Sequence, residues 1–97
     1  MPNYALRFDA KFEIDLENAI TYYEIRSKKV SMQFKQGVRK KLLSLKKSPL
    51  TGSVRYDDVR LARIERFPYA IHFTVDYSLR LVYIRALFSD FQDVNAV

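Results

Sequence analysis

The 97-residue chain has no cysteine, no tryptophan, two glycines and three prolines. Without cysteine it can hold neither a disulfide framework nor a thiolate nucleophile, and a cysteine-based zinc site is also excluded. No apolar run approaches the roughly 18 residues that a membrane span needs. The first residues lack the cationic start and apolar stretch of a secretory signal. We therefore expect a cytoplasmic protein that makes no contact with a membrane.

Short motifs for cofactor or nucleophile chemistry are missing as well. The two glycines, Gly37 and Gly52, are too few to build a loop that cradles phosphates. The sequence contains no Walker loop, dinucleotide fingerprint, Ser-His-Asp order or helical metal motif. We expect no cofactor, no metal ion and no small-molecule substrate.

What the chain does have is apolar area and positive charge. Hydrophobic residues make up 48% of it, including seven Phe and seven Tyr, which is enough for one core in a single domain spanning residues 1–97. The 17 Lys and Arg residues outnumber the 11 Asp and Glu residues, so the net charge is +6. The excess is local, because ten basic residues and no acidic one lie from Ile25 to Tyr56. Such a segment favours a polyanionic or acidic partner.

The first half of the chain predicts one strand and two helices. Residues 4–8 alternate loosely and are rich in strand formers. Asp9 then offers an N-cap, and the apolar residues between Phe12 and Tyr23 recur at the spacing of an amphipathic helix. A second stripe runs from Val30 to Leu45 and should end before Pro49, which disfavours a helical residue in front of it. Two helices with so short a join pack as an antiparallel hairpin.

The second half predicts three strands, at residues 59–64, 69–76 and 79–88, with a hairpin turn at residues 76–78. The order is therefore β-α-α-β-β-β. This order indicates an α+β domain in which the helical hairpin packs on one face of a mainly antiparallel sheet. Residues 89–97 are expected to form a short last helix or a disordered end.

His72 is the only histidine, and it alternates with core-type residues on a predicted inner strand. One interpretation is a general acid or base. The other is a histidine on the sheet face that is hydrogen-bonded to a neighbour. We favour the second interpretation, because no other residue of a catalytic type has a spacing that requires His72.

Arginines gather in the strand-forming half. They are Arg55, Arg60, Arg63 and Arg66, which precede Phe67-Pro68-Tyr69, together with Arg80 and Arg85. Residues two apart on a strand share a face, so Arg55, Arg63 and Arg85 converge if the strand registers cooperate. Convergent arginines can clamp phosphates and stabilise the charge that develops in phosphodiester cleavage, and they can equally hold the carboxylates of an acidic peptide. The alternative is that several are solvated or paired with Asp57, Asp58 and Glu65.

The predicted second helix carries cations off its apolar stripe. Lys35, Arg39 and Lys46 face water there. The helix is either a contact surface for phosphates or for an acidic partner, or an ordinary solvated helix surface.

From about residue 4 to residue 88, the sequence resembles the RelE/ParE superfamily of bacterial toxins from type II toxin–antitoxin systems. The residues that carry the resemblance are Asp15-Leu16, Ala19 and Tyr22-Tyr23, then Phe34, Val38, Leu42, Leu45, Ser48-Pro49 and Gly52, and finally Val59-Arg60 and Arg66-Phe67-Pro68-Tyr69-Ala70-Ile71-His72-Phe73. The resemblance implies a helical hairpin on a curved antiparallel sheet and an antitoxin whose acidic residues meet the toxin's arginines. RelE-like members cleave mRNA in the ribosome with basic residues, whereas ParE-like members inhibit DNA gyrase without catalytic residues.

Three positions depart from the RelE-like pattern that the resemblance implies. Ala70 stands where RelE-like sequences commonly have an arginine, and Ser89 and Gln92 stand where many members have a histidine and an arginine. Loss of one convergent cation costs a phosphoryl-transfer site several kcal/mol of transition-state stabilisation, so these departures count against ribonuclease chemistry. The Phe-Pro-Tyr turn is also similar to ParE-like sequences.

The resemblance therefore favours a toxin that inhibits DNA gyrase by binding and is not an enzyme. Two alternatives remain: a ribosome-dependent mRNA endoribonuclease, and a degenerate, non-toxic member that only binds an antitoxin. The residues expected to contact antitoxin or target are Arg60, Arg63, Arg66, Tyr69, Arg85, Lys35 and Arg39. If RNA is cleaved, Arg63 and Arg85 would stabilise the pentacoordinate phosphate, with His72 as a poor candidate base.

Overall fold

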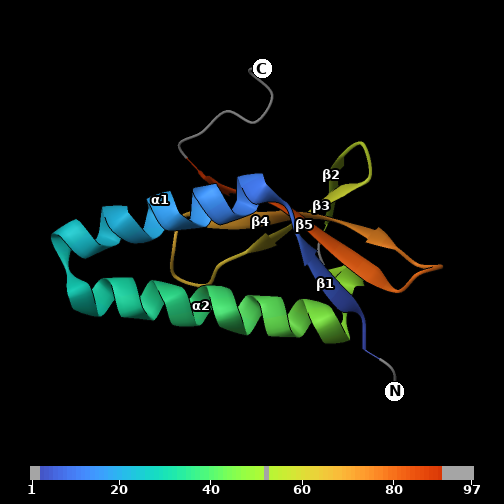
Figure 1. Ribbon diagram of the computed structural model, residues 1–97, viewed down its shortest axis with the longest axis horizontal. Coiled ribbons are helices and arrows are strands. Elements are labelled where there is room, and N and C mark those ends of the chain that lie inside the picture. Colours follow the sequence, from blue (N-terminus) through green and yellow to red (C-terminus); the bar gives the residue numbers. More distant parts are fainter. Residues whose placement is uncertain (1–2, 52, 91–97) are drawn as a thin grey trace.

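A computed structural model describes residues 3–51 and 53–90. Two helices lie on one side of a five-stranded sheet (Figure 1). The elements are β1 (Ala5–Phe8), α1 (Ala10–Arg26), α2 (Lys28–Lys47), a 3-10 turn (Pro49–Thr51), β2 (Ser53–Tyr56), β3 (Val59–Arg63), β4 (Tyr69–Asp76) and β5 (Leu81–Ser89). The predicted α+β class and the order β-α-α-β-β-β are confirmed, with one strand added.

The added strand is β2, which pairs with β3 at one edge of the sheet. Sequence analysis missed it because it has only four residues and its register shifts between Val54 and Tyr56. The last turn also differs slightly, since Asp76 still belongs to β4 and the turn runs over residues 77–80. Ser89, expected in the tail, is the last residue of β5, and residues 91–97 of that tail lie outside the described residues.

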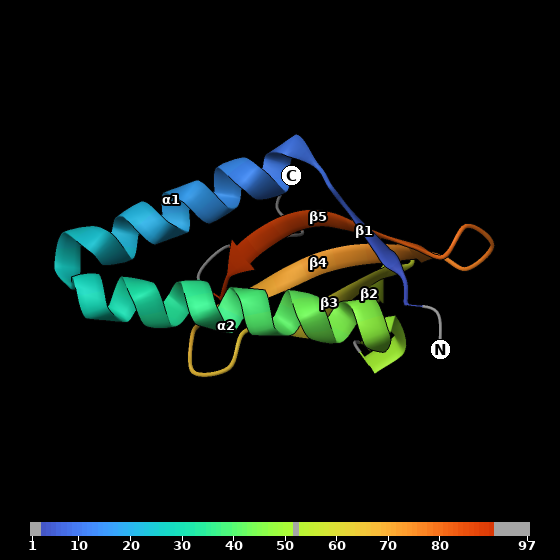
Figure 2. The same cartoon turned by 60° about the horizontal axis from the view of Figure 1, so that its bottom comes forward.

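The sheet has the order β1-β5-β4-β3-β2. Strand β1 runs parallel to β5, and the other neighbouring strands are antiparallel, so the sheet is mainly antiparallel as predicted. Figure 2 shows that β4 and β5 curve as they pass beneath the helices. The chain start therefore lies beside the last strand, which places α1 directly after β1 against β5.

The core lies between the helical hairpin and the sheet. Phe12 of α1 and Phe34 of α2 are buried against Ile71 and Phe73 of β4 and Ile84 of β5. These are the apolar stripe residues of the sequence, now facing alternate residues of the two central strands. Burying aromatic and aliphatic side chains of this size supplies the main driving force for folding.

The start of α1 is attached to β5 by two carboxylates. Asp9 is the N-cap residue, but its side chain makes no capping hydrogen bond and lies 3.3 Å from Nη1 of Arg85 instead. Asp15 accepts a hydrogen bond from the backbone N–H of Leu87 at 3.1 Å and is ion-paired with Lys11 at 2.9 Å. Strand β1 pairs with β5 only as far as Ile84, so the Asp15 carboxylate satisfies an N–H that no strand reaches.

Replacing Asp15 with alanine should lower the free energy of unfolding by about 1–3 kcal/mol, because the N–H of the buried Leu87 loses its acceptor. Urea denaturation would measure the change. Asp15→Asn keeps an acceptor oxygen and should cost less. Lys11→Gln removes only an exposed ion pair and should cost under about 1 kcal/mol. Equal losses in Asp15→Ala and Lys11→Gln would contradict the role given to Leu87.

Candidate functional site

The face of the sheet away from the helices carries the candidate catalytic residues. Side chains alternate along a strand, so Ile71 and Phe73 of β4 face the helices while Ala70, His72 and Thr74 face the other way. We call this second side the open face. Arg63 lies on it, since its register partner in β4 is Ala70.

Arg63 is held by a carboxylate at the end of β5. Its Nη2 donates to Oδ2 of Asp90 at 2.6 Å, and the backbone N–H of Asp90 donates to the carbonyl of Pro68 at 2.7 Å. The hydrogen bond from Arg63 and its positive charge hold the pKa of Asp90 below its ordinary value. The Arg63 side chain is nonetheless 60% exposed. Arg63 is therefore a surface cation, and the Asp90 carboxylate that pairs with it is also open to solvent.

Arg85 lies in a different environment. It falls at a bulge in the pairing of β4 with β5, between the pairs that His72 and Phe73 form. Its Nε donates to Oγ1 of Thr74 at 3.1 Å, its guanidinium carbon lies 4.6 Å from the ring centroid of Tyr83, and it pairs with Asp9. The bulge and these three contacts fix Arg85 on the β1 side of the sheet.

The structure does not bring Arg63 and Arg85 together. Arg63 lies opposite Ala70 and Arg85 bonds to Thr74, four residues further along β4, which is about 13 Å of strand. Each guanidinium is bound to its own carboxylate. The convergence that spacing allowed depended on strand register, and the register separates the two residues.

His72 is a buried histidine with a neighbour. It is 2% exposed, its Nδ1 lies 3.2 Å from the hydroxyl of Tyr56, and its ring packs edge-on against Phe88 with centroids 4.7 Å apart. This is the hydrogen-bonded sheet histidine that sequence analysis favoured. Tyr56 was not foreseen, because it lies on the missed strand β2.

Three of the predicted contact residues lie away from the open face. Arg60 pairs in register with Phe73 and so belongs to the helix side of β3. Tyr69 joins an aromatic cluster with Tyr23 and Phe34, and burial raises the pKa of its hydroxyl. Arg66 lies exposed in the turn between β3 and β4. Tyr69 thus contributes to the core, and the predicted contact residues do not form one patch.

Lys35 and Arg39 lie exposed on α2 as predicted. Lys35 pairs with Glu24 of α1 across the hairpin at 3.5 Å. Lys40, on the same helix, pairs with Glu65 of the β3–β4 turn at 3.8 Å. The acidic partners of the basic segment, Glu24 and Glu65, therefore lie before and after it in the sequence.

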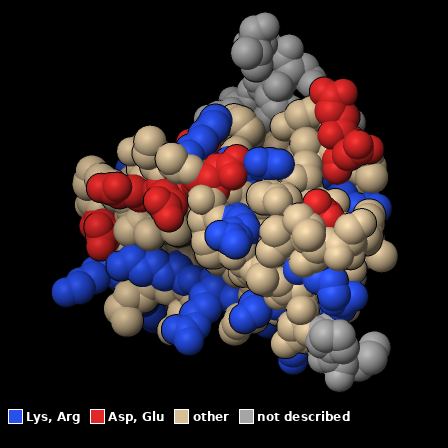
Figure 3. Space-filling model, turned by 45° about the vertical axis from the view of Figure 1, so that its right-hand side comes forward, with Lys and Arg blue, Asp and Glu red and all other residues tan. Residues whose placement is uncertain are grey.

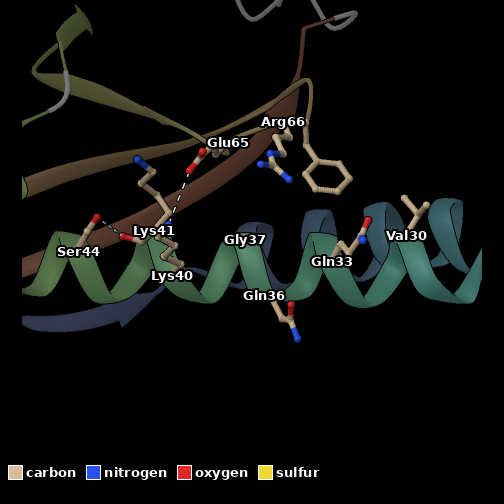
Figure 4. A pocket seen from close by; sticks show the side chains of 10 residues that line it. Val30, Gln33, Gln36, Gly37, Lys40, Lys41, Ser44, Glu65 and Arg66 are labelled. Atoms are coloured by element: carbon tan, nitrogen blue, oxygen red, sulfur yellow. Dashed lines mark hydrogen bonds and ion pairs between the residues drawn. The ribbon is translucent and has the colours of Figure 1, made fainter.

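Between α2 and the β3–β4 turn runs a groove of about 710 Å³. Its lining residues include Val30, Gly37, Lys40, Lys41, Arg66 and Phe67. Figure 4 shows Arg66 above the groove and α2 below it. The sequence held no signal for this groove, because it forms between segments about thirty residues apart.

Two classes of site have no support in the described part of the chain. Among residues 3–51 and 53–90, no three side chains of His, Asp or Glu are placed to hold a metal ion. No helix within these ranges is long and apolar enough to cross a bilayer.

Solved structures share this architecture. A chain of the chromosomal ParDE TA system from P. aeruginosa matches with a TM-score of 0.75 and 19% identity, over 89% of this chain and 95% of that one. The chain has the RelE/ParE fold. The intact E. coli RelBE toxin–antitoxin complex matches with a TM-score of 0.65 and 18% identity, over 89% and 95% of the two chains. The isolated E. coli RelE toxin matches with 0.64 and 17%, over 95% and 89%.

By sequence alone, no protein-family model and no curated protein matches the chain. The RelE/ParE fold is thus preserved here at identities below 20%. Such low identity is expected for this fold, because it depends on apolar stripes and strand pairing, and many different sequences meet these two requirements. The curved sheet and helical hairpin that the resemblance implied are confirmed.

The Arg63–Asp90 pair predicts a pH dependence. Carboxyl NMR should show Asp90 titrating below its ordinary value of 3.8, and Arg63→Gln should bring it back towards that value. Because the pKa is lowered in the folded state, the pair stabilises the fold above the unfolded pKa. That contribution is lost as the pH falls through the folded pKa. An Asp90 midpoint unchanged by Arg63→Gln would contradict the pairing.

Proposed function

We propose that this protein is the toxin of a type II toxin–antitoxin system, that an antitoxin protein neutralises it, and that it inhibits DNA gyrase by binding. The RelE/ParE fold over nearly the whole chain supports the first part, since three of the similar structures come from toxin–antitoxin complexes or systems. The TM-score of 0.75 to the ParDE chain, against 0.65 and 0.64 to the RelE-containing structures, supports the ParE-like side. Since the antitoxin and DNA gyrase are cytoplasmic proteins, the proposal also implies that this protein acts in the cytoplasm.

The separation of Arg63 from Arg85 is the observation that favours inhibition by binding over RNA cleavage. Phosphodiester cleavage needs cations aimed at one phosphorus, because the stabilisation comes from charge that is already in place when the transition state forms. Here the two arginines bind Asp90 and Asp9, and Ala70 adds no third cation between them. This arrangement supports binding rather than RNA hydrolysis.

His72 also fits a binding protein better than a nuclease. A general base must lie within hydrogen-bonding reach of the proton that it takes. At 2% exposure, behind Tyr56 and Phe88, the imidazole is closed to a ribose hydroxyl on the open face. Its role in the proposal is to hold β2 onto the sheet through Tyr56.

The open-face arginines fit an antitoxin with acidic residues. The Arg63 and Arg85 side chains are 60% and 44% exposed, and their ion pairs lie in solvent, where such pairs contribute little. A partner's carboxylates could replace Asp90 and Asp9 at small cost. The arginines would then act as anion contacts, the role that the resemblance implied.

Supercoiling by purified gyrase and ribosome-programmed mRNA cleavage, run with the same protein preparation, test the proposal. We expect loss of supercoiling and no cleavage. Cleavage that disappears in the Arg63→Ala, Arg85→Ala double variant, with gyrase unaffected, would replace the proposal with a RelE-type ribonuclease. No effect in either assay would contradict the toxin activity and leave a family member that only binds an antitoxin.

A further inference from the structure

The solvent face of α2 is a line of cations. Lys29, Lys40 and Lys47 recur at i, i+11 and i+18, so these three lysines lie on one face over about 27 Å, with the uncharged Gln36 between the first two. The helix carries eight Lys and Arg residues and no acidic residue. Figure 3 shows the basic side chains gathered along the lower side of the molecule, where α2 runs, with acidic side chains above them.

Most of the Lys and Arg side chains of α2 form no ion pair with the described residues. Among the described residues, only Lys35 and Lys40 of α2 form ion pairs. The Lys40–Glu65 pair spans 3.8 Å between side chains that are 81% and 72% exposed, so it is easily exchanged for another anion. Six cations on one helix therefore repel one another without compensation from a neighbour, a cost that a polyanion would remove.

Arg66 adds a cation on the other side of the groove. Its backbone has φ of 71°, in the left-handed region where glycine and asparagine are favoured over arginine. Within the described part of the chain, the guanidinium makes no hydrogen bond or ion pair. The turn thus keeps an arginine in a strained backbone conformation, and its guanidinium is available to an anion in the groove.

The groove brings Arg66 opposite α2. Gly37 lets the helix pass close to the end of β3, since a Cβ there would lie 3.1 Å from Cγ2 of Ile64. Figure 4 shows Gln33 on the side of α2 that faces the turn, and the ion pair that joins α2 to Glu65 of that turn. A phosphate placed in the groove would meet Lys40 and Lys41 of α2 and Arg66 of the turn, and it would have to displace the Glu65 carboxylate, which lines the same groove and pairs with Lys40.

We propose that this surface binds the phosphate backbone of duplex DNA, along α2 and across the groove to Arg66. The 27 Å line covers about eight base pairs. Lysines dominate it, which suits sequence-independent backbone contact. The proposal rests on the proposed function, because gyrase acts on DNA and a toxin that also holds DNA would meet the enzyme with its substrate bound.

An acidic protein is the competing occupant, and the surface suits it less. Protein interfaces depend on a contiguous, desolvated apolar centre, whereas protein–DNA interfaces are polar and strongly basic. The large exposed apolar residues of α2, Met32 and Leu43, stand eleven residues apart, about 16 Å along the axis. They form no continuous patch.

Fluorescence anisotropy with a labelled 24-base-pair duplex tests the proposal. Five cations contacting phosphates (Lys29, Lys40, Lys41, Lys47 and Arg66) predict that log K falls against log salt concentration with a slope of about −4.5. Lys40→Gln with Lys41→Gln should make that slope shallower by about 2, and Arg66→Asn by about 1. Asparagine tolerates the left-handed backbone, so Arg66→Asn should not lower the melting temperature.

The matched control is Arg7→Gln, which removes an exposed cation from β1. Arg7 pairs with Tyr83 and so lies on the open face, away from α2, and its loss should leave the slope unchanged. No binding at 50 mM salt, or an equal loss in Arg7→Gln, overturns the proposal. Tighter binding of poly-glutamate would assign the surface to an acidic protein instead, and tighter binding of duplex RNA to RNA.

The supercoiling assay separates this proposal from the proposed function. Wild-type protein that binds DNA as expected but leaves gyrase active contradicts the toxin activity and supports the DNA surface. A variant at Lys40, Lys41 and Arg66 that no longer binds DNA should inhibit gyrase at least several-fold less. Full inhibition by that variant overturns the link between the surface and gyrase.

Discussion

The pairing of β1 with β5 is the constraint on which the rest of the structure depends. It joins the first strand to the last one, so β1 forms one edge of the sheet and α1 packs against β5. The backbone N–H of Asp9 then donates to the carbonyl of Ile84, and the Asp15 carboxylate accepts from the backbone N–H of Leu87, so the beginning of α1 is held to β5. With α1 fixed, the one-residue join at Ser27 brings α2 back over β3 and β4 and closes the core.

The same constraint determines the open face. Arg85 is turned towards Asp9 because α1 begins at that edge, while Arg63 is two strands away and meets Asp90 at the other end of β5. The two arginines are consequently surface cations that an incoming anion can reach, and they do not form a single phosphate site. A change that detached α1 from β5 would therefore affect both the stability of the fold and the position of Arg85.

The two helices also differ in charge. The helix that touches β5, α1, carries all the acidic residues of the two helices, and every charged residue of α2 is basic. The open-face arginines and the basic line on α2 belong to different sides of the molecule. The acidic partner that we propose for the sheet and the phosphate backbone that we propose for α2 would therefore not compete for one surface.

The sequence by itself determined the secondary structure and fold class, because apolar spacing and the Ser48-Pro49 stop are local signals that each segment carries alone. It also favoured the hydrogen-bonded interpretation of His72 over the general-base one, since no other residue of a catalytic type has a spacing that requires His72. Only the tertiary structure decided the partners of Arg63 and Arg85, the existence of β2, the burial of Tyr69 and the groove below Arg66. Each of these depends on strand register or on the approach of distant segments, which arises from packing the whole chain and leaves no local pattern in its residues.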